Sequence, residues 1–490
     1  MSLDASVQSM RSLDGTFRVY IFIHLMKERI MKHRKLAVMT MTAAAVLGLA
    51  ACGQSADSST QTEAGSAAAG TESQASDDGV QELTFWHSMD GVYAEVLDKQ
   101  VAQFNDTVGK EQGIHVTPVF QNWPGTEGLT AAMSTDDIKN MPDVIQLYGE
   151  SVSLVRDYKR TVWAEDLMKA EDAVQKADLV PNARASFEIN GKMIGVPYST
   201  STLLLYYNQD YLDAAGVSVP KTIDEMAEEL PVLKDKTDAE YGLNVRVSLY
   251  ELGNWIATQG AEGTFLGDNN SGHTGEMTKI EAEDALDKYL TAWQKVVDSG
   301  AYKPQNDSIN EEFASGMHAM VIMSSSRIPT IKELVGDKFN WGVAQIPTVS
   351  ASDIGGAYPS GSGLFILNRD DDAKVQAAWT FEQYMISPEA QAMWAEGGAG
   401  YLPANTKAEE LDSYKNTIAE TPQLAVPGEV LMKANENVVA PFVPNSDGVD
   451  TVIKDAMTAF GSGSASKDDT KAAIIDGCNQ VFNDYYRTNG

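Results

Sequence analysis

The chain has 490 residues, of which 43% are hydrophobic and 8% aromatic, so it can bury the cores of two or three domains. Its 69 acidic and 37 basic side chains give a formal net charge of -32. This charge excludes nucleic-acid binding, because a phosphate backbone needs clustered lysine and arginine. It also disfavours broad docking on an anionic bilayer and is typical of an exported protein that stays in solution.

The first part of the chain has the pattern of an export signal. A basic cluster at residues 32–35 precedes an uncharged, apolar run from Leu36 to Ala51. That run is shorter than the about 20 residues of a membrane-spanning helix. A basic start, a short apolar stretch and small residues at the cleavage site are instead typical of a secretory signal peptide. We therefore expect residues 1–51 to be a signal region, with translation starting at Met31 or, alternatively, at Met26.

Cys52 follows this segment directly. The ending Leu-Ala-Ala-Cys resembles the bacterial lipobox, in which the cysteine becomes the lipidated first residue of the mature protein. An ordinary signal peptide with a chance cysteine is the alternative. Residues 52–81 have almost nothing to bury and are predicted to be a lipid-anchored flexible linker. The protein would then sit outside the cytoplasm, held on the outer face of the cytoplasmic membrane by its lipid rather than by a span.

The domain that follows begins with strands and helices in alternation. Periodicity predicts strands at 83–87, 114–120 and 143–148, with a helix over 93–108 after the first. Further strands are expected at 194–198 and 203–208. Such alternation predicts a mainly parallel α/β sheet.

Capping signals mark the start of two later helices. In a capping box the first side chain and the acidic side chain three residues later cap each other's backbone. We expect two such pairs: Thr222 with Glu225, and Thr278 with Glu281.

The last part of the chain contains three more predicted strands, at 320–323, 341–344 and 363–367, and is mostly helical from Asp371. Cys478 falls on an apolar helical stripe, so we expect a small buried hydrophobic residue rather than a reactive thiol. If Cys52 is consumed by processing, no disulfide can form within one chain.

Short motifs in a fixed order carry a resemblance to a known family. They are Phe85-Trp86-His87-Ser88-Met89, Pro142-Asp143-Val144-Ile145, Gly195-Val196-Pro197-Tyr198 with Leu205-Tyr206-Tyr207-Asn208, Pro220-Lys221-Thr222, Phe313-Ala314-Ser315-Gly316, Ser387-Pro388-Glu389 and Gly400-Tyr401-Leu402-Pro403. The chain resembles the family 1 extracellular solute-binding proteins of bacterial ABC importers, of the carbohydrate- and glycerol-3-phosphate-binding type. The resemblance runs from about Glu82 to about Tyr401 and more loosely to the end.

The resemblance implies an α/β, two-lobed periplasmic-binding-protein fold of the maltose-binding-protein-like type II, with a hinged ligand cleft. In this fold the chain passes between the lobes more than once. We expect crossings near Pro197, Ser324 and Asn368. The N-terminal lobe would then hold residues 82–197 and 324–368, and the C-terminal lobe residues 198–323 and 369–490.

A carbohydrate or polyol site needs flat aromatic faces against C–H groups and fixed polar partners for hydroxyls. Trp255 is expected to stack on the ligand, and Gly361 and Ser362 to form a loop whose backbone N–H groups approach it. Trp86 and His87 are also expected to line the cleft. The alternative is that Trp86 belongs to a core and that His87 is a surface histidine. The full set of ligand-binding residues that the resemblance implies is Trp86, His87, Tyr148, Glu150, Thr200, Ser201, Trp255, Ser325, Ser326, Arg327, Gly361, Ser362, Tyr401 and Asp447.

One departure from the family pattern concerns phosphate. The glycerol-3-phosphate binders carry an arginine in the segment that corresponds to 445–448, whereas this chain has Asn-Ser-Asp-Gly. Asp447 would repel a dianion, and Arg327 could replace the missing arginine only from another place. We therefore favour a neutral carbohydrate or polyol, with glycerol 3-phosphate or a glycerophosphodiester as the alternative.

Two other functions compete with transport. A surface-anchored carbohydrate hydrolase would need two suitably spaced carboxylates, but the chain has no metalloprotease motif, nucleophile turn or phosphate loop. A sensory or adhesive lipoprotein could keep the same fold. We expect a non-catalytic monomer whose partners are its ligand, the transmembrane permease subunits and the membrane.

We expect no cofactor and no metal. The four histidines beyond the signal region are too scattered for a zinc site: His87, His115, His273 and His318. The acidic and amide run at 268–272 lacks the full spacing of a calcium loop and is predicted to be a turn.

Overall fold

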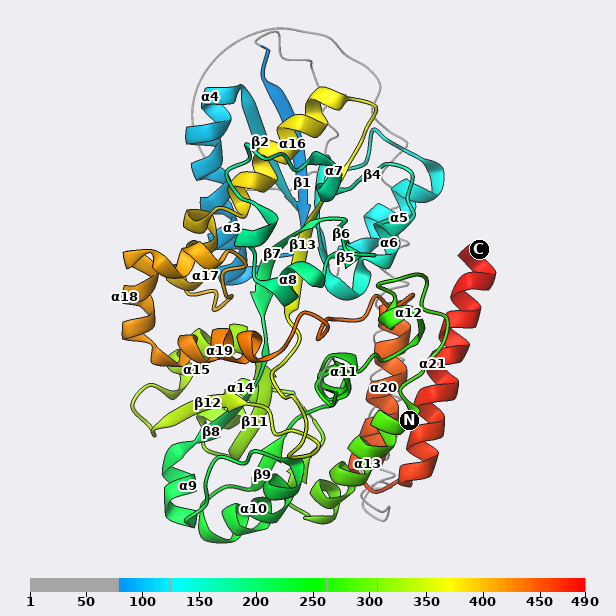
Figure 1. Cartoon of the computed structure of the whole chain (residues 1–490). Coiled ribbons are helices and arrows are strands. Elements are labelled where there is room, and N and C mark those ends of the chain that lie inside the picture. The colour runs from blue at the N-terminus through cyan, green and yellow to red at the C-terminus, as the bar shows by residue number, and fades with distance from the viewer. Residues whose placement is uncertain (1–78, 123–124, 261–262, 306, 490) are drawn as a thin grey trace, which may run out of the picture. The chain divides into compact units, whose positions relative to one another are not determined.

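The computed structural model describes residues 79–122, 125–260, 263–305 and 307–489, without the side chains of Glu150 and Asn489 (Figure 1). The signal region, the lipidated Cys52 and most of the expected linker lie outside these residues. The predictions made for them therefore remain predictions.

The first sheet is mixed and is built around three parallel strands. Its strand order is β2-β1-β3-β13-β4, and β7 also pairs with β13. β1 runs parallel to β2 and β3, whereas β13 runs antiparallel to β3, β4 and β7. The strand bounds are β1 (Gln81–His87), β2 (Ile114–Phe120), β3 (Val144–Tyr148), β4 (Thr161–Val162), β7 (Val196–Ser201) and β13 (Ser360–Leu367).

Helices pack on this sheet through apolar stripes. In α3 the buried residues include Val96, Leu97, Val101 and Phe104, spaced to lie on one side of the helix. They share a core with Trp379, from a helix much later in the chain. The elements are α3 (Gly91–Phe104), η2 (Asn105–Gly109), α4 (Lys110–Gln112), α5 (Thr126–Thr135), η3 (Gly149–Ser151), α6 (Ser153–Arg156), α7 (Ala164–Leu167), η4 (Lys176–Asp178), α8 (Pro181–Ala185), the hairpin β5 (Glu188–Ile189) and β6 (Lys192–Met193), α16 (Asp372–Met385) and α17 (Pro388–Glu396).

The second sheet has the strand order β10-β9-β11-β8-β12. β11 runs parallel to β9 and antiparallel to β8, and β12 returns antiparallel along the other edge of β8. The expectation of mainly parallel sheets is therefore wrong, because β8, β12 and β13 each reverse direction against a neighbour. The bounds are β8 (Leu203–Asn208), β9 (Tyr241–Asn244), β10 (Tyr302–Lys303), β11 (His318–Ser324) and β12 (Trp341–Gln345).

The second core includes residues from the end of the chain. Cys478 is fully buried there, as predicted, and burial raises the pKa of its thiol to about 12. The helical elements after β8 that precede α16 are α9 (Gln209–Ala215), α10 (Ile223–Lys236), α11 (Leu249–Ala257), α12 (Asp268–Ser271), α13 (Glu283–Asp298), α14 (Ile309–Ala314), η5 (Ser325–Arg327) and α15 (Ile328–Val335). Those after α17 are η6 (Thr406–Glu410), α18 (Asp412–Glu420), η7 (Pro422–Ala425), α19 (Val426–Lys433), α20 (Ser446–Gly461) and α21 (Lys467–Asn489).

We call the two sheets with their packed helices the first and second lobes. The chain first passes between the sheets at Thr202, close to the expected crossing near Pro197. The crossing expected near Ser324 is wrong, because Ser324 pairs with Leu203 and the following strand β12 also joins the second sheet. The return lies between β12 and β13. The crossing expected near Asn368 is wrong too, because α16 and α17 pack on the first core and the chain leaves only after them.

The two predicted capping boxes have different outcomes. Thr222 does cap α10 by accepting from the Glu225 backbone N–H at 3.1 Å, while the Glu225 carboxylate accepts from the Lys221 N–H. The second box is wrong. Thr278 instead donates its hydroxyl to Asp268, and α13 begins later, at Glu283.

Residues 268–272 form a turn, as predicted. Asn269, Asn270 and Ser271 all have left-handed backbone angles there. Among the residues that the structure describes, no helix combines the length and apolar character that crossing a membrane requires.

Candidate functional site

A cavity of about 290 Å³ lies between elements of the two lobes, and we call it the inner chamber. The first lobe contributes the end of β3, the turn η3 and the start of β13. The second lobe contributes the N-terminus of α11 and the first two turns of α20. The lining residues are Tyr148, Ser151, Ser248, Leu249, Tyr250, Ser360, Ser446, Asp447, Asp450 and Lys454.

The N-terminus of α11 is held rigidly beside this chamber. Ser248 and Glu251 form a capping box in which each side chain accepts from the other's backbone N–H. The neighbouring helix adds a second tie, because the Leu249 N–H donates to Asp450 at 3.1 Å. These bonds place Tyr250 at the chamber wall on a fixed backbone.

The charges in the inner chamber are partly compensated. Lys454 forms an ion pair with Asp450, one turn away on α20. Asp447 is exposed, and among the described residues no cation pairs with it. Its carboxylate can therefore accept hydrogen bonds from a ligand.

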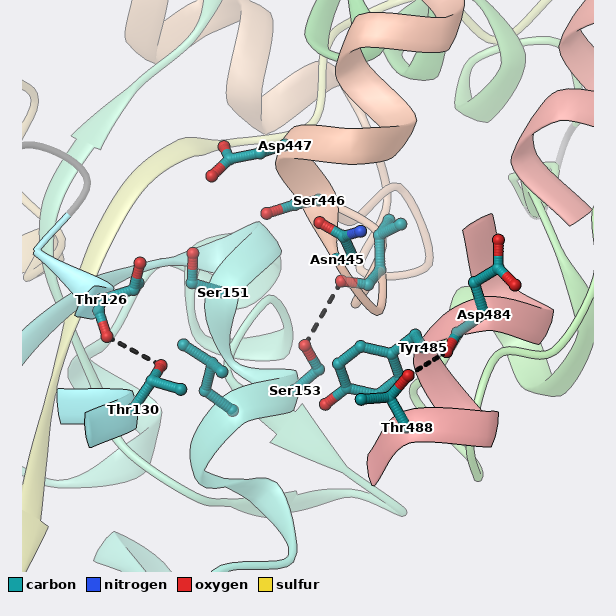
Figure 2. Close-up of a pocket in the computed structure, with 12 residues that line it drawn as sticks. Thr126, Thr130, Ser151, Ser153, Asn445, Ser446, Asp447, Asp484, Tyr485 and Thr488 are labelled. Atoms are coloured by element: carbon teal, nitrogen blue, oxygen red, sulfur yellow. Dashed lines mark hydrogen bonds between the residues drawn. The ribbon is translucent and has the colours of Figure 1, made fainter. Parts of the chain in front are cut away.

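A second cavity of about 420 Å³, the outer chamber, adjoins the inner one, and Ser151, Ser446 and Asp447 line both. Figure 2 shows Asp447 and Ser446 extending from the start of α20 above Ser151. The lining residues are Thr126, Thr130, Ser151, Ser153, Leu154, Val443, Asn445, Ser446, Asp447, Asp484, Tyr485 and Thr488.

Direct bonds tie the lobes together beside the outer chamber. The Ser153 hydroxyl of α6 donates to the Val443 carbonyl at 3.3 Å (Figure 2). Arg156, at the end of the same helix, donates to the Gly275 carbonyl and pairs with Glu276 at 3.4 Å. Because the wall segments on the two lobes are joined, a solute in the chambers would touch both lobes at once.

A family model described as bacterial extracellular solute-binding protein matches residues 99–425 of this sequence. The chain belongs to that family. Solute-binding proteins of this kind are the subunits that supply a solute to an ABC importer. A relative from Rhizobium meliloti (strain 1021), the sn-glycerol-3-phosphate-binding periplasmic protein UgpB, is 25% identical over 413 residues, which cover 80% of this chain and 91% of the relative.

Solved structures share the fold of this solute-binding protein. The cyclic α-maltosyl-1,6-maltose binding protein of Arthrobacter globiformis matches with a TM-score of 0.66 and 22% identity, over 83% of this chain and all of that one. UgpB of Mycobacterium tuberculosis, in complex with glycerophosphocholine, also matches with a TM-score of 0.66 and 22% identity, over 84% of this chain and all of that one. The two-lobed, maltose-binding-protein-like fold is therefore confirmed.

Two of the predicted ligand residues, Tyr148 and Asp447, line the inner chamber. Thr200 and Gly361 line a narrow pocket beside it, next to Ser360. Ser201 ends β7, where its hydroxyl lies 3.5 Å from the Ser360 carbonyl. For the side chain of Glu150 the structure gives no placement, so its role stays a prediction.

The expectation for Trp255 is wrong. Its side chain has no exposed surface and lies in the second core, with ring centres 5.0 Å from Tyr289 and 4.9 Å from Trp293. Its indole N–H donates to the Pro347 carbonyl. A tryptophan that is buried on every side has no face left for a ligand.

The loop expected at Gly361 and Ser362 is also wrong, because both belong to β13. Gly361 has φ 128°, and a Cβ there would lie 1.8 Å from the Ser199 carbonyl oxygen. The glycine is needed for close approach of β7 rather than for contact with a solute. Ser362 is fully buried, and its hydroxyl lies 2.7 Å from that of Ser199.

Ser325 and Ser326 make contacts within the protein, and Ser325 bonds to Thr202, where the chain passes between the sheets. Ser325 is buried, its N–H donates to the Thr202 carbonyl, and its hydroxyl accepts from the Thr202 N–H. Ser326 is mostly buried, and its carbonyl accepts from the Tyr93 hydroxyl at 3.4 Å. Arg327 is exposed, and its charge acts on the pKa of Tyr401.

Tyr401 is mostly buried, with its ring 5.1 Å from that of Tyr93. Burial raises the pKa of its hydroxyl, and the neighbouring Tyr148 raises it further. Tyr401 is therefore a neighbour of the chamber residue Tyr148.

Trp86 and His87 occupy the end of β1. Trp86 is half-buried and packs on the cluster that contains Leu129. His87 is buried with its ring centre 6.0 Å from that of Phe120, and burial lowers its pKa. The core alternative for Trp86 is thus closer to what is observed, whereas the surface alternative for His87 is wrong.

Sequence reasoning missed most of the chamber wall. Ser248 could have been found, because Ser-x-x-Glu before an apolar run is the capping signal that was recognised elsewhere. Asp450, Lys454 and Tyr485 lie on amphipathic helices far along the chain, where a polar side chain at a cavity looks like any solvated one. The described residues include no group of three or more potential metal ligands.

Proposed function

We propose that this solute-binding protein captures a non-phosphorylated carbohydrate or polyol between its lobes and delivers it to the permease of an ABC importer. The observation that supports this most is the inner chamber, in which Tyr148 of the first lobe and Tyr250 of the second accompany several hydroxyl and carboxylate groups. Aromatic faces cover C–H surfaces, and fixed polar groups pair with sugar hydroxyls that would be costly to bury alone.

The start of α20 supports a neutral ligand over a phosphate. A free helix N-terminus attracts phosphate, but the Gly448 N–H is already bonded to the Asn445 side chain at 3.2 Å. Asp447 adds a negative charge in the same turn. The one cation among the described lining residues, Lys454, is paired with Asp450.

Glycerol 3-phosphate or a glycerophosphodiester is the second candidate ligand. The relatives named UgpB favour it, because they are described as binding sn-glycerol 3-phosphate or were solved with glycerophosphocholine. Lys454 would then have to exchange its partner Asp450 for the phosphate.

A solute that contacts both lobes would favour their closed arrangement, and the permease would recognise that form. The relatives are named as periplasmic binding proteins. We therefore propose that the chain performs no chemistry on its ligand, and that it acts as a monomer. We further propose that lipidated Cys52 and the linker that precedes β1 hold it on the outer face of the cytoplasmic membrane.

A thermal-shift screen of the full chain against sugars, polyols, glycerol 3-phosphate and glycerophosphocholine tests this function. Bound ligand adds RT ln(1 + [L]/Kd) to the free energy of unfolding, about 2.7 kcal/mol at a hundredfold excess over Kd. We expect a rise in Tm with at least one neutral sugar or polyol. A rise with the phosphates alone would select the second candidate, and turnover of a bound oligosaccharide would contradict the non-catalytic role.

A further inference from the structure

We infer that the outer chamber holds a second sugar unit, so that the ligand is an oligosaccharide of two or more units. This inference rests on the proposed function, since it places one unit in the inner chamber. It concerns the lining residues of the outer chamber, which come from α5, η3, α6, the start of α20 and α21 and only partly coincide with those of the inner chamber.

The two chambers are adjacent and share part of their walls. Ser151 on the first lobe and Ser446 and Asp447 on the second line both of them. A ligand that fills the inner chamber of about 290 Å³ can therefore extend past Asp447 into the outer chamber of about 420 Å³. The larger of these cavities is within the size range of small-molecule sites, about 300–1,000 Å³.

The outer chamber has the chemistry of a sugar site. Four of its lining side chains are aliphatic hydroxyls on the first-lobe side: Thr126, Thr130, Ser151 and Ser153. Hydroxyls both donate and accept, as sugar hydroxyls do. Facing them, the second lobe adds the amide of Asn445, the carboxylates of Asp447 and Asp484 and the phenol ring of Tyr485 (Figure 2).

The charge of the outer chamber favours a neutral sugar unit over a phosphate. None of the twelve described residues that line it is a lysine or an arginine. Asp447 places a negative charge on one wall without a partner cation among the described residues, whereas Asp484 is paired with Arg487 at 2.8 Å. A dianion would therefore meet the carboxylate of Asp447 and no lysine or arginine among the described lining residues. A neutral, hydroxylated extension of the ligand satisfies the same groups without that repulsion.

Thr130 and Tyr485 line the outer chamber but not the inner one. Substitutions of these two residues can therefore test binding of the second sugar unit separately from binding of the first. Thr130 is exposed on α5, where its hydroxyl donates to the Thr126 carbonyl at 2.8 Å. Thr130→Trp would fill the chamber from an exposed helical position. Thr291 of α13 is a matched control, because it is an exposed helical threonine whose hydroxyl donates to the carbonyl four residues earlier.

The test measures Kd by calorimetry for the full chain with three homologous series: glucose, maltose and maltotriose; glucose, cellobiose and cellotriose; galactose, melibiose and raffinose. In the series that binds, we expect at least a tenfold gain from one unit to two or three. Thr130→Trp should remove that gain and leave monosaccharide affinity within about threefold. Tyr485→Ala should weaken only the longer ligands, and Thr291→Trp should change nothing.

Two results would overturn the inference while the proposed function stands. One is a monosaccharide that binds as tightly as its longer homologues. The other is an oligosaccharide whose affinity neither Thr130→Trp nor Tyr485→Ala lowers, although ligand-free melting temperatures match. If no member of any series binds and only glycerol 3-phosphate does, the neutral-ligand proposal fails and the inference fails with it.

Discussion

Lys454 and Asp450 form an ion pair across one turn of α20, inside the chamber that lies between the lobes. Lys454 is the one lysine among the described residues that line either chamber, and this ion pair engages its charge. Removing the Asp450 carboxylate should therefore change the relative affinity for sugar and phosphate ligands.

Asp450→Asn should increase affinity for glycerol 3-phosphate by about tenfold, because it frees Lys454 and removes one negative charge. The amide oxygen can still accept from the Leu249 N–H, so α11 should stay in place. Calorimetry at low and high salt measures the effect, which should shrink as salt increases. Asp287→Asn, which breaks a comparable pair with Lys467 on other helices, is the control. Equal phosphate affinity in both variants would contradict the prediction.

Tyr250→Ala should lower affinity for a bound sugar by about tenfold or more, since it removes an aromatic face from the inner chamber. The Tyr358 hydroxyl donates to the backbone carbonyl of Tyr250, so this bond survives the substitution. Fluorescence titration gives the affinity, and the ligand-free Tm reports on folding. A variant that binds normally would remove Tyr250 from the site.

Trp255→Ala should destabilise the fold by about 3–5 kcal/mol, because it leaves a cavity in the second core. Urea unfolding monitored by circular dichroism measures this loss. Trp86→Ala, at a half-buried position, should cost less. A Trp255→Ala protein of normal stability that cannot bind sugar would contradict this prediction and would indicate that Trp255 stacks on the ligand, as expected from the sequence.

Gly361→Ala should prevent stable folding or cost several kcal/mol, because the added methyl group would collide with the Ser199 carbonyl oxygen. Gly398→Ala is the matched comparison. Its φ is also positive, at 75°, but nothing lies within 4 Å of the new Cβ. That variant should lose only about 1–2 kcal/mol, the cost of the left-handed backbone. Similar unfolding midpoints for the two would contradict the steric explanation.

The free energy of unfolding should fall as pH drops below about 6.5, the ordinary pKa of histidine. Burial lowers the pKa of His87, His273 and His318, so the folded chain keeps them neutral while the unfolded chain binds protons. Above pH 6.5 both states are neutral, and this contribution to the pH dependence disappears. His87→Gln should make the acid-side slope shallower, because it removes one of these three buried groups. An unchanged slope for His87→Gln would mean that His87 is protonated in the folded state.

Local patterns predicted the elements well, because a strand or helix is encoded by neighbouring residues. The strand over 114–120 was predicted with its observed bounds, and Thr222 caps the helix where its spacing placed it. Pairing between distant segments was predicted less well. Nothing in the run at 341–344 indicates that it returns to the second sheet beside β8, so the lobe boundary at 324 was wrong.

Two of the predicted ligand residues, Tyr148 and Asp447, line the inner chamber, and their contact with a ligand stays a prediction. Trp255 failed because the sequence shows an aromatic residue on a helix but not which neighbours surround it. In the structure Tyr289 and Trp293, from a separate helix, enclose it.

The family match ends at residue 425, whereas α20 and α21 begin at Ser446 and Lys467. These two helices, which supply much of the wall around the chambers, thus lie beyond the residues that the family model matches. If the chambers hold the ligand as proposed, substitutions of the chamber-facing residues of these two helices should change the ligand preference without touching any strand pairing. The opposite faces of the same two helices, which include Ile453 and Cys478, belong to the second core and have to be preserved when the chamber residues are changed.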